Sequence, residues 1–152
     1  MTEGRLGLYY PVGSDIADTF YEAIRMRDLG ESDVALQILD SILESKPNEL
    51  SSRLVRGQLQ KDLLQFEKAI EDFRYITLAD DIAQYHICSL ASRSLFHSLL
   101  RVGQMQEAFM EAERYFSLVG KDHFVAYYKT YTELKELSPR WSAEDIARKL
   151  NE

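Results

Sequence analysis

The amino-acid sequence repeats a pattern of small and large apolar residues at a spacing of 34 positions. Ala35 corresponds to Ala69 and Leu39 to Phe73, and the same spacing relates Ala23 to Gly57, Leu29 to Leu63, and Ile42 to Ile76. A repeat of this length usually forms one supersecondary unit, which buries its apolar face only by stacking on its neighbours. The spacing therefore predicts an array of repeated units.

Each unit is predicted to contain two helices, because its apolar residues recur at intervals of three and four. The predicted units cover residues 16–49, 50–83 and 89–120. Turns between the paired helices are expected at Gly30 and Gly103, and Asp15 is the predicted N-cap of the first helix. Pro47 ends the first unit, since proline cannot continue a helix.

Three further segments complete the predicted organisation, an all-α helix–turn–helix solenoid of about eight helices. Residues 1–14 form an N-terminal tail, and Asp80 and Asp81 make the turn that ends the second unit. An extra helix is expected over 122–137, and residues 138–152 hold a short capping helix that begins after Ser142. A cap of this kind covers the apolar face that the end of a repeat stack exposes.

Composition excludes several classes of function. The net charge of −7 opposes binding to the backbone of a nucleic acid, and no stretch of about 18 apolar residues predicts membrane insertion. The single cysteine, Cys88, favours a reducing, cytoplasmic environment. No phosphate-binding loop, zinc motif or catalytic constellation is present, so we expect neither an enzyme nor a cofactor.

The repeat resembles the tetratricopeptide family, whose 34-residue units have small residues at fixed helix contacts, a glycine at the turn and a closing proline. The first unit matches at Ala23, Gly30, Ala35 and Pro47, and the third at Gly103 and Ala108. The second matches at Gly57 and Ala69, and the resemblance places Leu64 at its turn. Two departures from the family stand out. Phe96 occupies a position that usually holds a small residue, and Glu22 and Arg56, 34 apart, either face solvent or pair across neighbouring units.

The resemblance implies that the first helix of each unit lines a concave groove in which a partner peptide lies. The groove positions carried over to this chain are Phe20, Tyr21, Ile24, Arg27, Leu54, Val55, Gln58, Lys61, Arg93, His97 and Arg101. Chaperone-binding members hold a terminal carboxylate with Lys and Asn. The matching positions in this chain hold uncharged residues, so a terminal carboxylate is not expected as the ligand. These positions are Phe20, Ile24, Val55, Leu90 and Ser94.

The predicted function is therefore that of a protein-binding module, an adaptor or chaperone-like domain. Its partner would be a peptide or helix with apolar anchors and some acidic character, because basic side chains flank an apolar floor. The alternative is a structural subunit or homo-oligomer. That role would use one of two apolar surfaces. The first is the N-terminal set Leu6, Leu8, Tyr9 and Tyr10. The second is the C-terminal aromatic stripe Phe124, Tyr127, Tyr128 and Tyr131, which otherwise packs on Tyr115 and Phe116.

Overall fold

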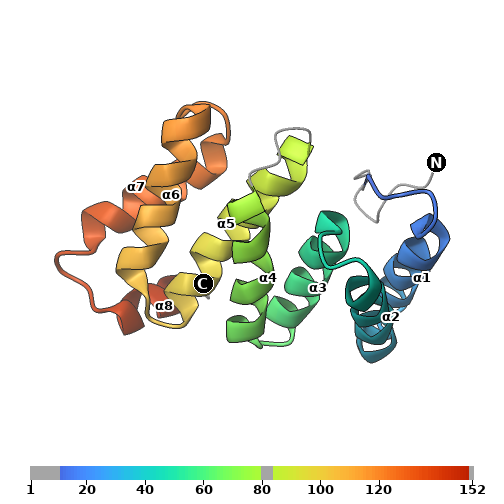
Figure 1. Cartoon of the computed structure of the whole chain (residues 1–152). Helices are drawn as coiled ribbons and strands as arrows, with labels where there is room; N and C mark the ends of the chain where they lie inside the picture. Colours follow the sequence, from blue (N-terminus) through green and yellow to red (C-terminus); the bar gives the residue numbers. More distant parts are fainter. Residues whose placement is uncertain (1–10, 80–83, 151–152) are drawn as a thin grey trace.

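The computed structural model describes residues 11–79 and 84–150, and the predicted all-α class is confirmed. Figure 1 shows the helices side by side in chain order, from α1 at one end to α7 near the other. Their bounds are α1 Ala17–Asp28, α2 Ser32–Ser45, α3 Leu50–Asp62, α4 Phe66–Ala79, α5 Tyr85–Arg101, α6 Met105–Val119, α7 Val125–Leu137 and α8 Ala143–Leu150. The expected turn at Asp80 and Asp81 lies outside the described residues, and α5 begins earlier than the third unit was predicted to begin.

Small residues lie where the helices pack most closely, as the repeat pattern predicts. Ala23, Ala35, Ala69 and Ala108 are completely buried. Gly57 of α3 lies against the ring of Phe73 on α4, and a Cβ at this position would come within 2.6 Å of that ring. Since real Cβ contacts are longer, α3 and α4 can approach this closely only because position 57 has no side chain.

The turns inside the three helix pairs share one backbone conformation. Gly30, Leu64 and Gly103 have φ values of +82°, +65° and +84°, so each predicted turn is confirmed. Glycine adopts this left-handed region without strain, whereas leucine does not. The predicted cap at Asp15 is wrong, because α1 begins after Ile16 without a side-chain cap and the Asp15 carboxylate pairs with Lys46 instead.

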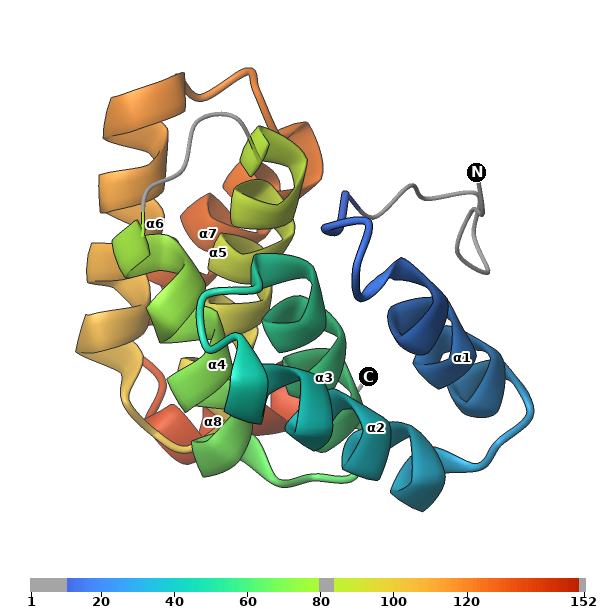
Figure 2. The same cartoon turned by 45° about the vertical axis from the view of Figure 1, so that its right-hand side comes forward.

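The array curves toward its odd-numbered helices. Among the described residues, α3 contacts both α1 and α5, while no comparable contact joins α2 to α4 or α4 to α6. Figure 2 shows α1, α3 and α5 along one side of the array and α2, α4 and α6 along the other. Helices that touch on one side and separate on the other produce a curved stack. We call the side formed by α1, α3 and α5 the inner face.

Aromatic packing closes the C-terminal end of the array. The Tyr127 ring is fully buried, and its centroid lies 4.8 Å from that of Phe116 and 5.4 Å from that of Tyr115, so the predicted packing of the stripe is confirmed. Phe96 fills the same cluster, with its centroid 5.3 Å from that of Tyr127. The helix α8 then packs against α5, and Ser142 caps it as predicted by accepting a hydrogen bond from the Asp145 N–H.

Candidate functional site

The apolar part of the predicted groove belongs to the hydrophobic core. Phe20, Leu54 and Val55 have no exposed surface, and Ile24 retains only 4%. These side chains pack between helices and cannot serve as open anchors, so the prediction of an apolar groove floor at these four positions is wrong. Tyr21 remains half-buried, with its ring edge-on to Phe20, and contributes to a shallow hollow on α1.

The polar part of the predicted groove divides into two groups. Arg27 pairs with Asp28 on α1, and Gln58 is half-buried on α3. The other four residues form what we call the inner basic cluster: Lys61 near the end of α3, and Arg93, His97 and Arg101 at four-residue intervals along α5. Because residues four apart share one face of a helix, the α5 side chains form a single stripe next to Lys61.

Charges in the inner basic cluster act on one another. Burial lowers the pKa of Lys61, the positive charges of Arg93 and Arg101 lower it further, and the negative charge of Asp62 partly offsets them. Burial also lowers the pKa of His97 to about 3, with the charges of Lys61 and Arg93 adding to the effect. His97 is therefore neutral near pH 7, and the cluster carries three positive charges, those of Lys61, Arg93 and Arg101.

Two polar atoms of this cluster are buried without a hydrogen-bond partner among the described residues. They are Nε of Arg93 and Nε2 of His97. Aromatic rings support the two guanidinium groups, since Arg93 lies 5.9 Å from the Phe124 ring centroid and Arg101 lies 4.6 Å from that of Phe66. Cation–π contacts orient a guanidinium group without neutralising it. The cluster thus presents buried donors and an excess of positive charge, an unfavourable arrangement that an anion would relieve.

A second group of arginines surrounds the buried carboxylate of Asp72, which is 2% exposed. Arg56 donates to both of its oxygens, at 2.7 and 2.8 Å, and also to Asp40 at 2.9 Å. Arg53 donates to Asp72 at 3.1 Å, and its guanidinium carbon lies 3.7 Å from the Tyr75 ring centroid. We call these four charged residues the Asp72 network. The network joins α2, α3 and α4. The pairing of Glu22 with Arg56 across neighbouring units, one of the two expected alternatives, is not found, because Glu22 pairs with Arg25 instead.

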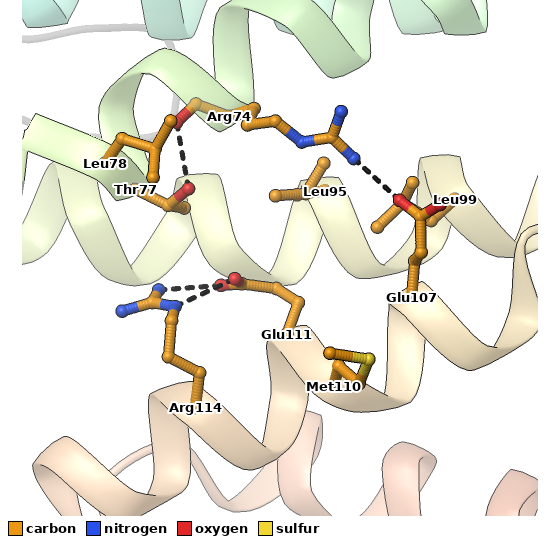
Figure 3. A pocket seen from close by; sticks show the side chains of 9 residues that line it. All are labelled: Arg74, Thr77, Leu78, Leu95, Leu99, Glu107, Met110, Glu111 and Arg114. Carbon is orange, nitrogen blue, oxygen red and sulfur yellow. Dashed lines mark hydrogen bonds and ion pairs between the residues drawn. The ribbon is translucent and has the colours of Figure 1, made fainter.

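The outer side of the array contains a groove of about 410 Å³ between α4 and α6. Figure 3 shows Leu95 and Leu99 of α5 between the flanking helices, with Leu78 on the α4 side of the groove and Met110 on the α6 side. An ion pair of 3.0 Å joins Arg74 to Glu107 across the groove, and Arg114 pairs with Glu111. The sequence analysis did not identify this groove. Its only sequence signal is exposed apolar residues on the second helices, which is weak evidence for a site.

Other functional features are limited. Within residues 11–79 and 84–150, no three His, Cys, Asp or Glu side chains are grouped as a metal site requires. In the same part of the chain, no helix has the length and apolar character that crossing a bilayer demands. The N-terminal apolar residues Leu6, Leu8, Tyr9 and Tyr10 lie outside the described residues.

Comparison with protein-family models, with curated proteins and with solved structures found no match for this chain. A functional assignment therefore depends on the residues and on the geometry described above.

Proposed function

We propose that this chain is a tetratricopeptide-like, non-catalytic module of the cytoplasm that binds an acidic segment of a partner polypeptide on its inner face. One observation supports the proposal most directly. The inner basic cluster carries three positive charges, and only Lys61 among the described residues of the cluster has a neighbouring carboxylate, Asp62, which offsets its charge in part. This excess of positive charge stands out because acidic residues outnumber basic ones by 25 to 18 over the whole sequence.

Comparison with the other arginines shows how unusual the cluster is. Six arginines in the described ranges are half-buried. Four of them pair with carboxylates: Arg27, Arg53, Arg56 and Arg114. Only Arg93 and Arg101 have an aromatic contact and no carboxylate. Because an acidic protein offers many carboxylates, two half-buried arginines without one indicate that a ligand supplies the negative charge.

The mechanism is electrostatic recognition on a preformed surface. Helix stacking holds Lys61 and the α5 stripe in place before binding, so the partner bears most of the ordering entropy. Half-buried charges are screened less than exposed ones, which makes each ionic contact stronger than its counterpart on an open surface. The net negative charge elsewhere repels acidic partners that approach other faces, which favours binding in one place.

A peptide-binding titration tests the proposal. Fluorescence anisotropy would compare pools of labelled peptides rich in glutamate, in lysine or in uncharged residues. We expect the acidic pool to bind, and to weaken at least tenfold between 50 and 300 mM salt, as roughly two to three ionic contacts would require. Lys61→Gln combined with Arg101→Gln should weaken binding by a similar factor, while Arg74→Gln on the outer side serves as the matched control. Equal binding of all three pools would contradict the proposal.

The outer groove supports a second candidate, that of a subunit in a larger assembly. Leu78 and Met110 are 77% and 61% exposed beside the groove, whereas the aromatic stripe is largely occupied within the chain. Light scattering over a range of concentrations would test self-association, and Met110→Glu should abolish it. A monomer at every concentration would exclude the homo-oligomer.

A further inference from the structure

We propose that the inner basic cluster is a subsite for a compact dianion, the phosphate monoester of a phosphorylated side chain in the partner segment. This inference depends on the proposed function, since it specifies which acidic group occupies the same site. It concerns Lys61, Arg93, His97 and Arg101, and it follows from charge balance, from the number of donors and from their burial.

Charge balance favours two negative charges over one. The Asp72 network shows how this protein compensates half-buried arginines, because Arg53 and Arg56 are matched by the two carboxylates of Asp72 and Asp40. The inner basic cluster carries one more cation than that network. Asp62 partly offsets the charge of Lys61, but no carboxylate of the described chain forms an ion pair with the cluster. One further carboxylate would still leave an excess of positive charge, whereas a phosphate monoester brings about −1.5 to −2 charges at pH 7.

The number and origin of the donors favour phosphate over a carboxylate. Donors converge from two helices, with Lys61 on α3 and the stripe of Arg93, His97 and Arg101 on α5. A phosphate monoester presents three terminal oxygens in a tetrahedral arrangement, so it accepts from several directions at once. A carboxylate has two oxygens in one plane. The fork of an arginine and the point charge of a lysine are both common phosphate ligands.

Burial of the donors distinguishes this cluster from a solvated basic surface. Nε of Arg93 and Nε2 of His97 lie one helical turn apart, and both are shielded from water without a partner. A neutral imidazole has one N–H to donate, so His97 can contribute a hydrogen bond without adding charge. The ring of Phe124 beside Arg93 and that of Phe66 beside Arg101 restrict these side chains before binding. The site is therefore preorganised for an anion.

The test uses the full chain and three degenerate peptide pools that differ only at a fixed central position. That position is phosphoserine, serine, or a pair of glutamates, and anisotropy or calorimetry gives the dissociation constants. We expect the phosphoserine pool to bind at least tenfold more tightly than the glutamate pool, and serine to bind more weakly still. Inorganic phosphate should compete with the phosphoserine pool, which identifies the phosphoryl group itself as the ligand.

Variants assign the binding to the cluster. Arg93→Gln should lower affinity for the phosphoserine pool at least tenfold, and Arg101→Gln serves as the second variant if Arg93→Gln fails to fold by circular dichroism. Arg74→Gln, whose guanidinium is paired on the outer side, should leave affinity unchanged.

The outcomes separate the two proposals. Equal affinity for the glutamate and phosphoserine pools would overturn the phosphate subsite and leave the proposed binding of acidic segments intact. Failure of both pools to bind better than the serine pool would overturn both. Phosphoserine binding that Arg93→Gln and Arg101→Gln do not weaken would place the phosphate elsewhere and also overturn the inference.

Discussion

The Asp72 network and the inner basic cluster both contain half-buried basic side chains, but only those of the network are paired with carboxylates. In the network, two arginines of α3 meet a buried carboxylate from α4 and a second carboxylate from α2. In the cluster, Lys61, Arg93 and Arg101 act on one another, Asp62 only partly offsets the charge of Lys61, and no carboxylate of the described chain forms an ion pair with the cluster. Neighbouring parts of one array thus contain a balanced and an unbalanced group of charges.

The difference shows how to separate structural charges from functional ones. A balanced group of charges holds helices together. The hydrogen bonds from Arg56 to Asp72 raise the pKa of the Arg56 guanidinium, which shows that the two side chains interact strongly. An unbalanced group lowers the stability of the empty protein, because like charges repel and buried donors lack acceptors. Stability and binding should therefore respond in opposite directions in the two places.

The largest effect is expected from Asp72→Asn. This substitution leaves Arg53 and Arg56 half-buried without their shared carboxylate, and breaking a buried ion pair in this way costs about 3–5 kcal/mol of unfolding free energy. Thermal or urea unfolding would measure the loss. Asp40→Asn is the control, since its carboxylate is 63% exposed and pairs with Arg56 at the edge of the network. A loss below about 1 kcal/mol for Asp72→Asn would show that the network does not hold the helices together.

The second-largest effect is expected at His97, as a loss of unfolding free energy at acidic pH. Its pKa of about 3 in the folded protein lies below the ordinary value of 6.5, so the unfolded chain binds the additional proton between these pH values. Stability due to this group is complete above pH 6.5 and falls as the pH drops toward 3. His97→Gln should remove about 2–3 kcal/mol of the stability lost between pH 7 and pH 4. Identical pH profiles for the variant and the wild type would contradict the burial of a neutral imidazole.

A smaller effect of opposite sign is expected from Lys61→Gln. Removing one of three mutually repelling charges should raise the unfolding free energy by up to about 1 kcal/mol, while peptide binding weakens. Denaturant titration and anisotropy on the same preparation would show whether the two changes diverge. If stability falls by more than about 1 kcal/mol instead, Lys61 is a structural residue and the contrast with the Asp72 network disappears.

The smallest effect is expected from Arg74→Gln. The pair of Arg74 with Glu107 is exposed on both sides, at 46% and 54% of side-chain area, so its removal should change stability by less than about 0.5 kcal/mol. Differential scanning calorimetry of the wild type and the Arg74→Gln variant would measure this change in stability. A larger loss would mean that this ion pair holds α4 and α6 together across the outer groove.

Sequence reasoning predicted the features that depend on local pattern. The helix pairs, the left-handed turn at Gly30 and the packing of Tyr127 on Tyr115 and Phe116 follow from spacing or residue type. The turn at Leu64 was expected, but its left-handed backbone was not, because leucine disfavours that conformation. The resemblance to the tetratricopeptide family implied that Lys61 of α3 and the basic residues of α5 share one face, and the structure brings these side chains close enough for their charges to interact.

The same reasoning failed at Phe20, Ile24, Leu54 and Val55, which are buried. One residue turns a helix by about 100°, so a slight error in register exchanges a core position for a groove position. The Asp72 network was missed because Arg56 and Asp72 come from different helices, and no local pattern reports their orientation. The outer groove depends on the separation of α4 and α6, which is a property of the assembled stack.

Leu64 shows that the three units reach one shape by different chemical means. Its left-handed backbone is the one that glycine adopts in the first and third turns, and its side chain is 66% exposed, so little packing compensates for the strain. The three turns are therefore more alike in their backbone φ angles than in their residue types. A comparison that scores residue identity alone would rank the middle turn as unrelated, although the chain bends there as it does in its neighbours.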